Sequence, residues 1–193
     1  MTPRRNLVET FRVVIDALTA AGLPYAFIGA LPVLAWGRVR ATTDIDVVVV
    51  AATGWERLVA ALRQREIVFT KQIGPPERTD ELADIAVFHT ASDPRIRIDV
   101  FIAKTDFERT VVATTRSATV LGLDVRLACP EASIIYKLLA NRRRDLDDVE
   151  SIFEARRTAG ELLDWAFLDH WAAEWGLTER LARYRAEFKA SSA

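Results

Sequence analysis

Cysteine, histidine and any excess of charge are scarce in this chain. Cys129 is the only cysteine among the 193 residues, which excludes a disulfide framework and a zinc site built from cysteines. The two histidines, His89 and His170, stand apart in the sequence, and we assign them no chemistry. The 26 basic and 27 acidic residues nearly cancel, which argues against a surface that binds nucleic acid over its whole extent but leaves local basic patches open.

Long hydrophobic runs are also missing. The longest uninterrupted apolar run, Val47–Ala52, is far shorter than a membrane span. Near the amino terminus, Glu9 and Asp16 interrupt the apolar pattern, which a secretory signal would not allow. The sequence therefore predicts a cytoplasmic protein without a membrane partner.

Half of the chain is hydrophobic, which is enough for one packed domain and a small appended lobe. Apolar periodicity predicts a first helix that begins near Leu7 and stops at Gly22. After it we expect alternating strands and short helices. The predicted strands cover 25–28, 45–50, 67–70, 85–89 and 96–102, followed by a hairpin around Gly122, and the predicted helices between them cover 31–36, 55–64 and a short segment after Thr105.

Every element predicted after Pro130 is a helix, with ranges of 131–140, 146–156, 164–175 and 179–188. This order predicts an α+β fold with a helical carboxy-terminal tail. We expect an α/β core over residues 1–128 and a helical subdomain, packed on that core, over residues 129–193. Two pairs at capping-box spacing, Thr53 with Glu56 and Thr105 with Glu108, predict where two of the shorter helices begin.

The first chemical signal is the pair Asp44 and Asp46. Side chains alternate across a strand, so both carboxylates project on one face while Ile45 projects on the other. Two ionised carboxylates at this spacing repel each other, and a cation such as Mg²⁺, which takes oxygen ligands, would relieve that repulsion. The alternative interpretation is a solvated strand start.

The second signal is Asp99, an acid within the apolar run 96–102. A carboxylate in such a strand is costly unless it is paired or binds a metal ion. A metal ligand and an ion pair with Arg95 or Arg97 are both consistent with this pattern. A third, weaker signal is the turn at Gly29 and Ala30, where small residues before a helix would let backbone N–H groups approach a phosphate.

Together these segments resemble the nucleotidyltransferase superfamily that shares its fold with DNA polymerase β. The family pattern is a small-residue turn, a helix, two alternating aspartates and a third acid on a later strand, and here it reads FIGALPVLAWGRVRATTDIDVVVV followed by IRIDVFIA. The segment that leads into Asp44 is similar to that of small bacterial members, namely minimal nucleotidyltransferases, AbiEii-type toxins and MenT-like toxins. One departure is Ala30, where the family commonly has glycine or serine. The resemblance implies a mixed sheet flanked by helices.

A later segment, CPEASIIYKLLANRRRDLDDVESI, resembles the helix of such proteins that carries a lysine and ends in an Arg-Asp motif. A continuous helix here would place Lys137, Asn141, Arg144 and Asp148 along one side. The resemblance implies a functional Lys137. The alternative is a surface lysine before a charged helix junction capped by Asp145.

The resemblance also implies roles for the site residues. Two Mg²⁺ ions would be held by Asp44, Asp46 and Asp99, and Asp99 would also accept the proton of the attacking hydroxyl. Lys137 would neutralise charge in the transition state together with Arg40. The set expected to bind the nucleotide comprises Gly29, Ala30, Arg40, Thr43, Lys137 and Arg144.

The acceptor of the nucleotide is less constrained by the sequence. The resemblance to small toxins implies an RNA acceptor, with tRNA first, and an antitoxin protein as partner. A small molecule, as in aminoglycoside nucleotidyltransferases, is the alternative acceptor. A third hypothesis is a catalytically silent module that binds a nucleotide or a partner, and Ala30 is the feature that favours it.

Overall fold

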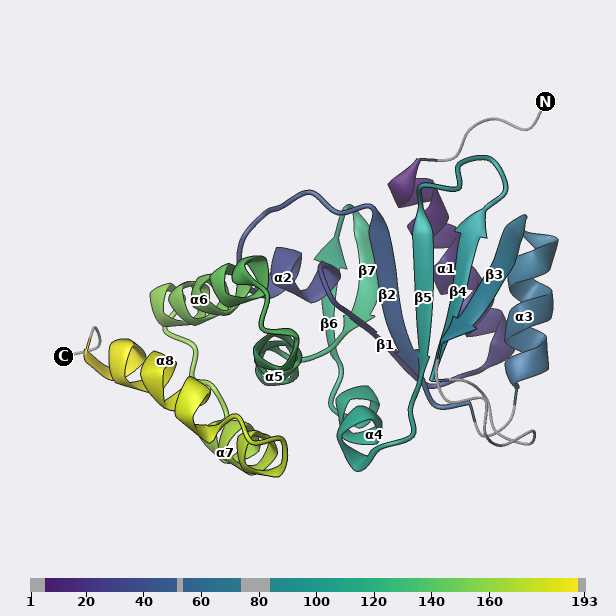
Figure 1. The fold of residues 1–193 in the computed structure, drawn as a ribbon. Helices are drawn as coiled ribbons and strands as arrows, with labels where there is room; N and C mark the ends of the chain where they lie inside the picture. Colours follow the sequence, from purple (N-terminus) through teal and green to yellow (C-terminus); the bar gives the residue numbers. More distant parts are fainter. Residues whose placement is uncertain (1–5, 52–53, 74–83, 191–193) are drawn as a thin grey trace.

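The computed structural model describes residues 6–51, 54–73 and 84–190 of the chain. Its centre is a mixed sheet, with helices on both faces (Figure 1). The strands are β1 (Tyr25–Ile28), β2 (Asp44–Val49), β3 (Ile67–Ile73), β4 (Ile85–Thr90), β5 (Arg97–Ile102), β6 (Arg116–Val120) and β7 (Leu123–Leu127). The helices are α1 (Leu7–Ala21), α2 (Leu31–Trp36), α3 (Trp55–Gln64), α4 (Asp106–Ala113), α5 (Pro130–Ala140), α6 (Arg143–Thr158), α7 (Trp165–Glu174) and α8 (Thr178–Ala190).

The strand order across the sheet is β3-β4-β5-β2-β1-β7-β6. β2 pairs in parallel with β5, and β1 pairs in parallel with β7, whereas the other neighbours are antiparallel. The central strand β2 therefore joins segments that are distant in the sequence. The α+β class and the mixed sheet flanked by helices are as the sequence predicted.

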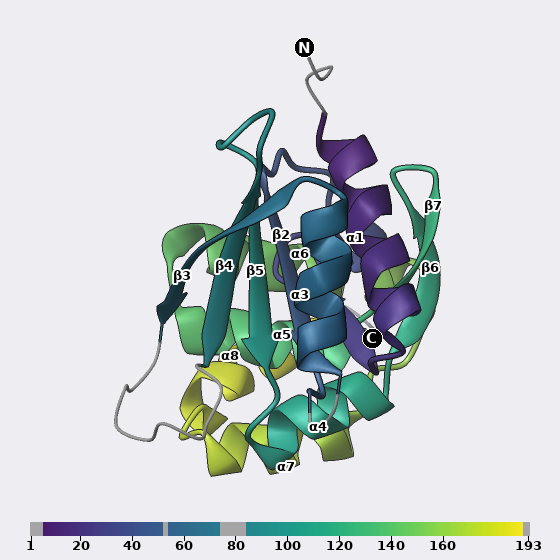
Figure 2. The ribbon, with the colours of Figure 1, turned by 90° about the vertical axis from the view of Figure 1, so that its right-hand side faces the viewer.

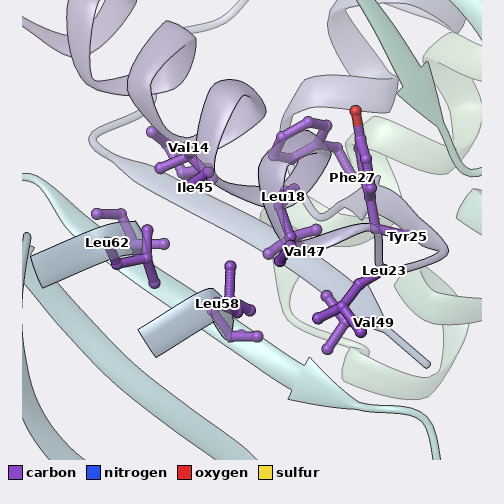
Figure 3. Close-up of a cluster of buried hydrophobic side chains, with 14 of the residues drawn as sticks. Val14, Leu18, Leu23, Tyr25, Phe27, Ile45, Val47, Val49, Leu58 and Leu62 are labelled. Carbon is purple, nitrogen blue, oxygen red and sulfur yellow. The ribbon is translucent and has the colours of Figure 1, made fainter. Parts of the chain in front are cut away.

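The face of the sheet toward α1 and α3 carries the larger hydrophobic core (Figure 2). Figure 3 shows how the odd-numbered residues of β2, Ile45, Val47 and Val49, meet side chains from both helices and from β1. Helix α1 is positioned by a full capping box between Asn6 and Glu9. Because alternate residues of β2 are committed to this core, its even-numbered residues must project from the opposite face.

That opposite face is covered by α4 and by α5–α8, which form a second hydrophobic cluster. Val48 of β2 and Ile28 of β1 belong to this cluster, as do Ile134, Ile135 and Leu138 of α5. Side chains of α5 thus share a cluster with the strands, whereas α7 packs against α5 and α8 packs against α6 and α7. The division of the chain at residues 128 and 129 remains a prediction.

Several element boundaries differ from those predicted. Asp44 lies within β2 rather than before it, and β3 continues to Ile73. Helix α4 has the predicted capping box of Thr105 and Glu108. Thr53 lies outside the described residues, and Gly54 is the N-cap of α3, without a side-chain cap. No helix within the described ranges has the length and apolar character needed to cross a membrane.

The packing of β1 on α1 yields a stability prediction. Phe27 is fully buried and contacts the ring of Phe11 edge-on, so Phe27→Ala should lower the free energy of unfolding by about 3–5 kcal/mol. Val39, which is 91% exposed, is the control, and Val39→Ala should change it by no more than about 0.5 kcal/mol. Urea denaturation of the two variants measures both values. Equal effects would contradict the assignment of Phe27 to the core.

Candidate active site

Two carboxylates of β2 face the layer formed by α5 and α6. Asp44 and Asp46 lie on the same face as the buried Val48, while Ile45 is fully buried in the core on the other side. This alternation follows from the strand geometry predicted for the pair. The carboxylates are partly exposed at the end of the strand where the chain arrives from α2.

The third acid lies directly beside this pair. In the parallel pairing of β2 with β5, Asp46 is the register partner of Asp99, and Asp44 is the partner of Arg97. Register partners project on the same face of a sheet, so the structure brings the three predicted acids together. Arg97 donates from Nε to Oδ1 of Asp99 over 2.6 Å. The ion pair that the sequence left open is therefore formed by Arg97, whereas Arg95 pairs with Asp93.

Gly29 allows the acidic strand to approach the turn after β1. Its φ of +70° lies in the left-handed region, and a Cβ atom there would stand 2.0 Å from Oδ2 of Asp46. Only glycine satisfies both requirements without displacing the carboxylate. Ala30 follows as the first residue before α2, a helix of only six residues with Pro32 in its first turn. The dipole of so short a helix adds little to this site.

The concentration of acids changes the protonation of Asp46. Burial, followed by the neighbouring charges of Asp99 and Asp44, raises the pKa of its carboxyl group to about 6, a net value that includes the opposing effect of Lys137 and Arg97. Burial also raises the pKa of Asp99, and the hydrogen bond from Arg97 opposes this shift. Keeping these neighbouring carboxylates ionised therefore costs free energy.

A divalent cation fits this donor set, because three adjacent carboxylates offer the oxygen ligands that Mg²⁺ takes and the cation would offset their repulsion. Within the described residues, no group of three or more His, Cys, Asp or Glu side chains is arranged as a ready metal site. Asp99 is engaged by Arg97 instead. This contact occupies Oδ1 of Asp99 and leaves Oδ2 as a ligand atom for a cation.

Lys137 of α5 lies below the acids and is buried, with 5% of its surface exposed. Its Nζ lies 3.1 Å from Oδ1 of Asp145 and 3.0 Å from Oδ2 of Asp148, and both of these carboxylates are fully buried. The helix that we considered as continuous is in fact interrupted, because Asn141 is a left-handed C-cap with φ of 51°. The single continuous helix that we considered is therefore not formed, and the two separate helices predicted over 131–140 and 146–156 are present as α5 and α6.

The break at Asn141 gives α6 its own amino terminus. Asp145 accepts from the backbone N–H of Arg142 in a capping box, and the Arg142 side chain donates to the same carboxylate. A charged helix junction with Asp145 as a capping residue, the alternative given by the sequence, is thus present. Lys137, however, is not the surface lysine of that alternative.

Two adjoining cavities open at this place, one of about 210 Å³ and one of about 360 Å³. They share Gly29, Asp44, Asp46, Lys137, Arg142 and Arg144. The smaller cavity adds Ala30, Arg40, Ala41, Thr42 and Thr43, so that it contains every predicted nucleotide-binding residue. The larger cavity adds Asp99, Arg97, Phe101 and Tyr136 among its walls.

Four residues of the site were given no binding or catalytic role by the sequence, although three of them, Arg97, Asp145 and Asp148, were named in it. Arg142 lines both cavities, Arg97 pairs with Asp99, and Asp145 and Asp148 hold Lys137. The sequence predicted separate helices over 131–140 and 146–156, and the capping-box spacing of Arg142 and Asp145 could have placed the start of the second one earlier, at Arg143. No local pattern identifies the contact of Lys137 with Asp148, because it joins two helices.

The unfavourable ionisation of the Asp46 carboxyl group yields a prediction about the stability of the fold. Because the folded-state pKa is raised to about 6, the ionised group disfavours folding, and this penalty grows as the pH rises from about 4 to about 6. In the presence of a chelator, Asp46→Asn should therefore raise the free energy of unfolding at pH 7.5 by roughly 1–3 kcal/mol. Below about pH 4 the same substitution should change this free energy little, because the wild-type carboxyl group is then protonated in both states. Glu154→Gln, at an exposed position, is the control. A lower melting temperature for Asp46→Asn would show that stabilising contacts of the carboxylate dominate.

The close approach at Gly29 is tested by comparison with Gly122. Both glycines have positive φ, but a Cβ atom at Gly122 would meet nothing within 4 Å. Gly122→Ala should therefore cost about 1 kcal/mol of stability, and Gly29→Ala should cost at least about 1 kcal/mol more. Adding Asp46→Ala to Gly29→Ala should recover most of the difference in a thermal melt. Equal costs at both glycines would contradict the contact with Asp46.

No family model matches this chain, and neither does any curated protein. Solved structures do resemble it. ANT(2'')-Ia in complex with adenylyl-2''-tobramycin is 15% identical, covers 96% of this chain and 98% of its own, and has a TM-score of 0.55. The lincosamide antibiotic adenylyltransferase LnuA, bound to lincomycin, is 11% identical over 78% of this chain and 98% of its own, with a TM-score of 0.54.

A third match is a nucleotidyltransferase-like protein from Paracoccidioides brasiliensis. It is 18% identical, covers 93% of this chain and 91% of its own, and has a TM-score of 0.56. At such low identities the likeness concerns the fold. The chain has the nucleotidyltransferase fold that its sequence predicted.

Proposed function

We propose that this protein is a Mg²⁺-dependent nucleotidyltransferase that transfers a nucleoside monophosphate from a nucleoside triphosphate to an acceptor hydroxyl. The observation that carries the proposal is the distribution of charge around the smaller cavity. Asp44 and Asp46 lie on one side of it, and Arg40, Lys137, Arg142 and Arg144 supply cationic side chains. A triphosphate with a bound metal ion carries both kinds of charge, and it needs both kinds of partner.

The residues of this cavity have distinct roles in the proposal. Arg40, Arg142 and Arg144 bind phosphate oxygens, and Thr43 supplies a hydroxyl at the edge of the cavity. The turn at Gly29 and Ala30 brings the backbone close to the terminal phosphates. Lys137 stabilises the negative charge that develops on the phosphates during transfer.

The transfer step is a displacement at the α-phosphorus. The acceptor oxygen forms a bond to phosphorus, the bond to the bridging oxygen breaks, and pyrophosphate leaves. Asp99, in the larger cavity, accepts the proton of the acceptor hydroxyl. For this role Asp99 must be ionised, so the transfer rate should decline in acid. Asp44, Asp46 and Asp99 would hold the metal ions, which supply charge neutralisation and acidify the hydroxyl when bound.

The larger cavity is the acceptor side of the site in this proposal, since it reaches Asp99 and adds the aromatic walls Phe101 and Tyr136. Three arginines, Arg97, Arg142 and Arg144, line it as well. Guanidinium groups beside aromatic rings suit a nucleotide with its phosphate. We therefore keep an RNA acceptor, tRNA first, as the leading proposal, with an antitoxin protein as a candidate partner.

A small-molecule acceptor is the second candidate. It is favoured by the similarity in fold to ANT(2'')-Ia with its adenylylated tobramycin and to LnuA with its lincomycin. The larger cavity, of about 360 Å³, has a volume typical of small-molecule sites. The walls of the larger cavity carry four acidic and four basic side chains, so their charge selects neither a cationic nor an anionic acceptor.

A label-transfer assay tests the proposed activity. Each α-labelled nucleoside triphosphate is incubated with the protein, Mg²⁺, bulk tRNA and a cell extract. We expect label in an acceptor with the wild-type protein and loss of at least about 10³-fold in the double variant Asp44→Ala, Asp46→Ala, because the metal ligands are removed. Circular dichroism confirms that the double variant is folded.

The migration of the label separates the acceptor classes. Label in RNA supports the leading proposal, whereas label in a low-mass product supports the small-molecule alternative. No label above the level of the double variant, with a folded wild-type protein, would overturn the transferase proposal and favour the silent binding module. Nucleotide binding without a requirement for Mg²⁺ would point the same way.

A further inference from the structure

A network of buried charges lies behind the cationic side of the smaller cavity. Its anions are Asp145 and Asp148, whose side chains are fully buried. Its central cation is Lys137, which contacts both of them. Two ionised carboxylates without solvent are costly, so such a cluster persists only when the partners are well placed.

Asp148 connects three segments of the chain. It lies 3.0 Å from Nζ of Lys137 on α5, 3.3 Å from Nε of Arg40 and 3.2 Å from an amino group of Arg38. Arg38 and Arg40 belong to the loop that leads from α2 to the acidic strand β2. One buried carboxylate therefore fixes the loop before Asp44 against α5 and α6.

The contacts of Lys137 restrict the direction of its ammonium group. Its Nζ donates a hydrogen bond to Oδ1 of Asp145 and lies 3.0 Å from Oδ2 of Asp148, an ion-pair contact without hydrogen-bond geometry. Lys137 also lines both cavities, so its ammonium group is held between these two carboxylates and the wall that the cavities share. Arg40 is held similarly, since its Nε faces Asp148 while its side chain lines the smaller cavity.

We infer that Asp148 is a positioning residue for nucleotidyl transfer: it orients Lys137 and Arg40 toward the phosphates of the bound nucleotide. That the oriented cations meet phosphates rests on the proposed function. That Asp148 orients the two cations does not. A buried ion cluster contributes little net stability compared with apolar packing, whereas pre-oriented charge contributes strongly to a transition state. Asp145 supports Lys137 from the other side.

The neighbouring Asp147 provides a matched control. Its side chain is 48% exposed, and it lies 3.5 Å from Arg38, but it is not among the partners described for Lys137 or Arg40. Asp147→Asn removes the same charge one residue away. The comparison of Asp148→Asn with Asp147→Asn therefore separates the buried contact from a general loss of negative charge on α6.

The first experiment observes Lys137 directly, without any substrate. An ammonium that is buried and ion-paired exchanges its protons slowly, so ¹⁵N-labelled protein should show its side-chain N–H signal by NMR. Lys137→Met assigns the signal against those of Lys71, Lys104 and Lys189. We expect the Lys137 signal to be lost or strongly shifted in Asp148→Asn and to be retained in Asp147→Asn.

The second experiment measures kcat and KM for the nucleotide. Asp148→Asn should lower kcat/KM by about 10²-fold, Asp147→Asn by less than about twofold, and Asp148→Glu should recover part of the loss because it restores the charge. In a background that carries both Lys137→Met and Arg40→Gln, adding Asp148→Asn should cost less than about threefold, because its effect on kcat passes through these two cations. Changes that still multiply in this combined variant would overturn the inference.

The outcomes distinguish the inference from the function on which it rests. A Lys137 signal that is unchanged in Asp148→Asn overturns the positioning role, whether or not the protein is an enzyme. A dependent signal in a protein that transfers no label confirms the orientation and overturns the activity. If Asp148→Asn does not fold, Asp148→Glu takes its place in both experiments. A shifted Lys137 signal with an unchanged kcat then contradicts the inference, and a change in both the signal and kcat supports it.

Discussion

Repulsion between carboxylates at one end of the β2–β5 pair is the constraint on which the surrounding structure depends. The parallel register places Asp46 beside Asp99, and the strand period places Asp44 on the same face. Because the opposite face of β2 is fully committed to the core under α1 and α3, these acids cannot turn away. The neighbouring elements must therefore supply positive charge, and Arg97 of β5 and Lys137 of α5 do so, since both lower the pKa of Asp46.

The acids themselves could be predicted from the sequence because they depend on a local period. Asp44, Asp46 and Asp99 are separated from apolar neighbours by the alternation of a strand, and the resemblance supplied their relation in space. The turn at Gly29 could be placed in the same way, and its contact with Asp46 gives a reason for a glycine there. The cavity that contains the predicted nucleotide-binding residues extends this agreement, although their roles remain proposals.

The cationic side of the site could not be predicted in the same detail. The segment around Asn141 reads as helical on both sides, and the left-handed conformation of a single residue decides that two helices form. This break allows Asp145 and Asp148 to face Lys137 from α6, where a continuous helix would have placed Lys137 and Asp148 in a row. Such contacts depend on the angle between two helices, which no sequence period encodes. The burial of Lys137 could not be predicted from the sequence for the same reason.

The separation of the site along the chain has a consequence for synthesis and folding. Gly29 and Asp46 are made early, Asp99 later, and Lys137 and Asp148 only after the entire sheet has been translated. Contacts between segments so far apart form late, because the intervening chain must first be ordered. Until α5 and α6 dock, the acidic face of β2 lacks the cations of those helices. A ribosome-bound chain that ends before α6 would thus lack Arg144, Asp145 and Asp148, and the two cavities beside β2 would be completed only with the last third of translation.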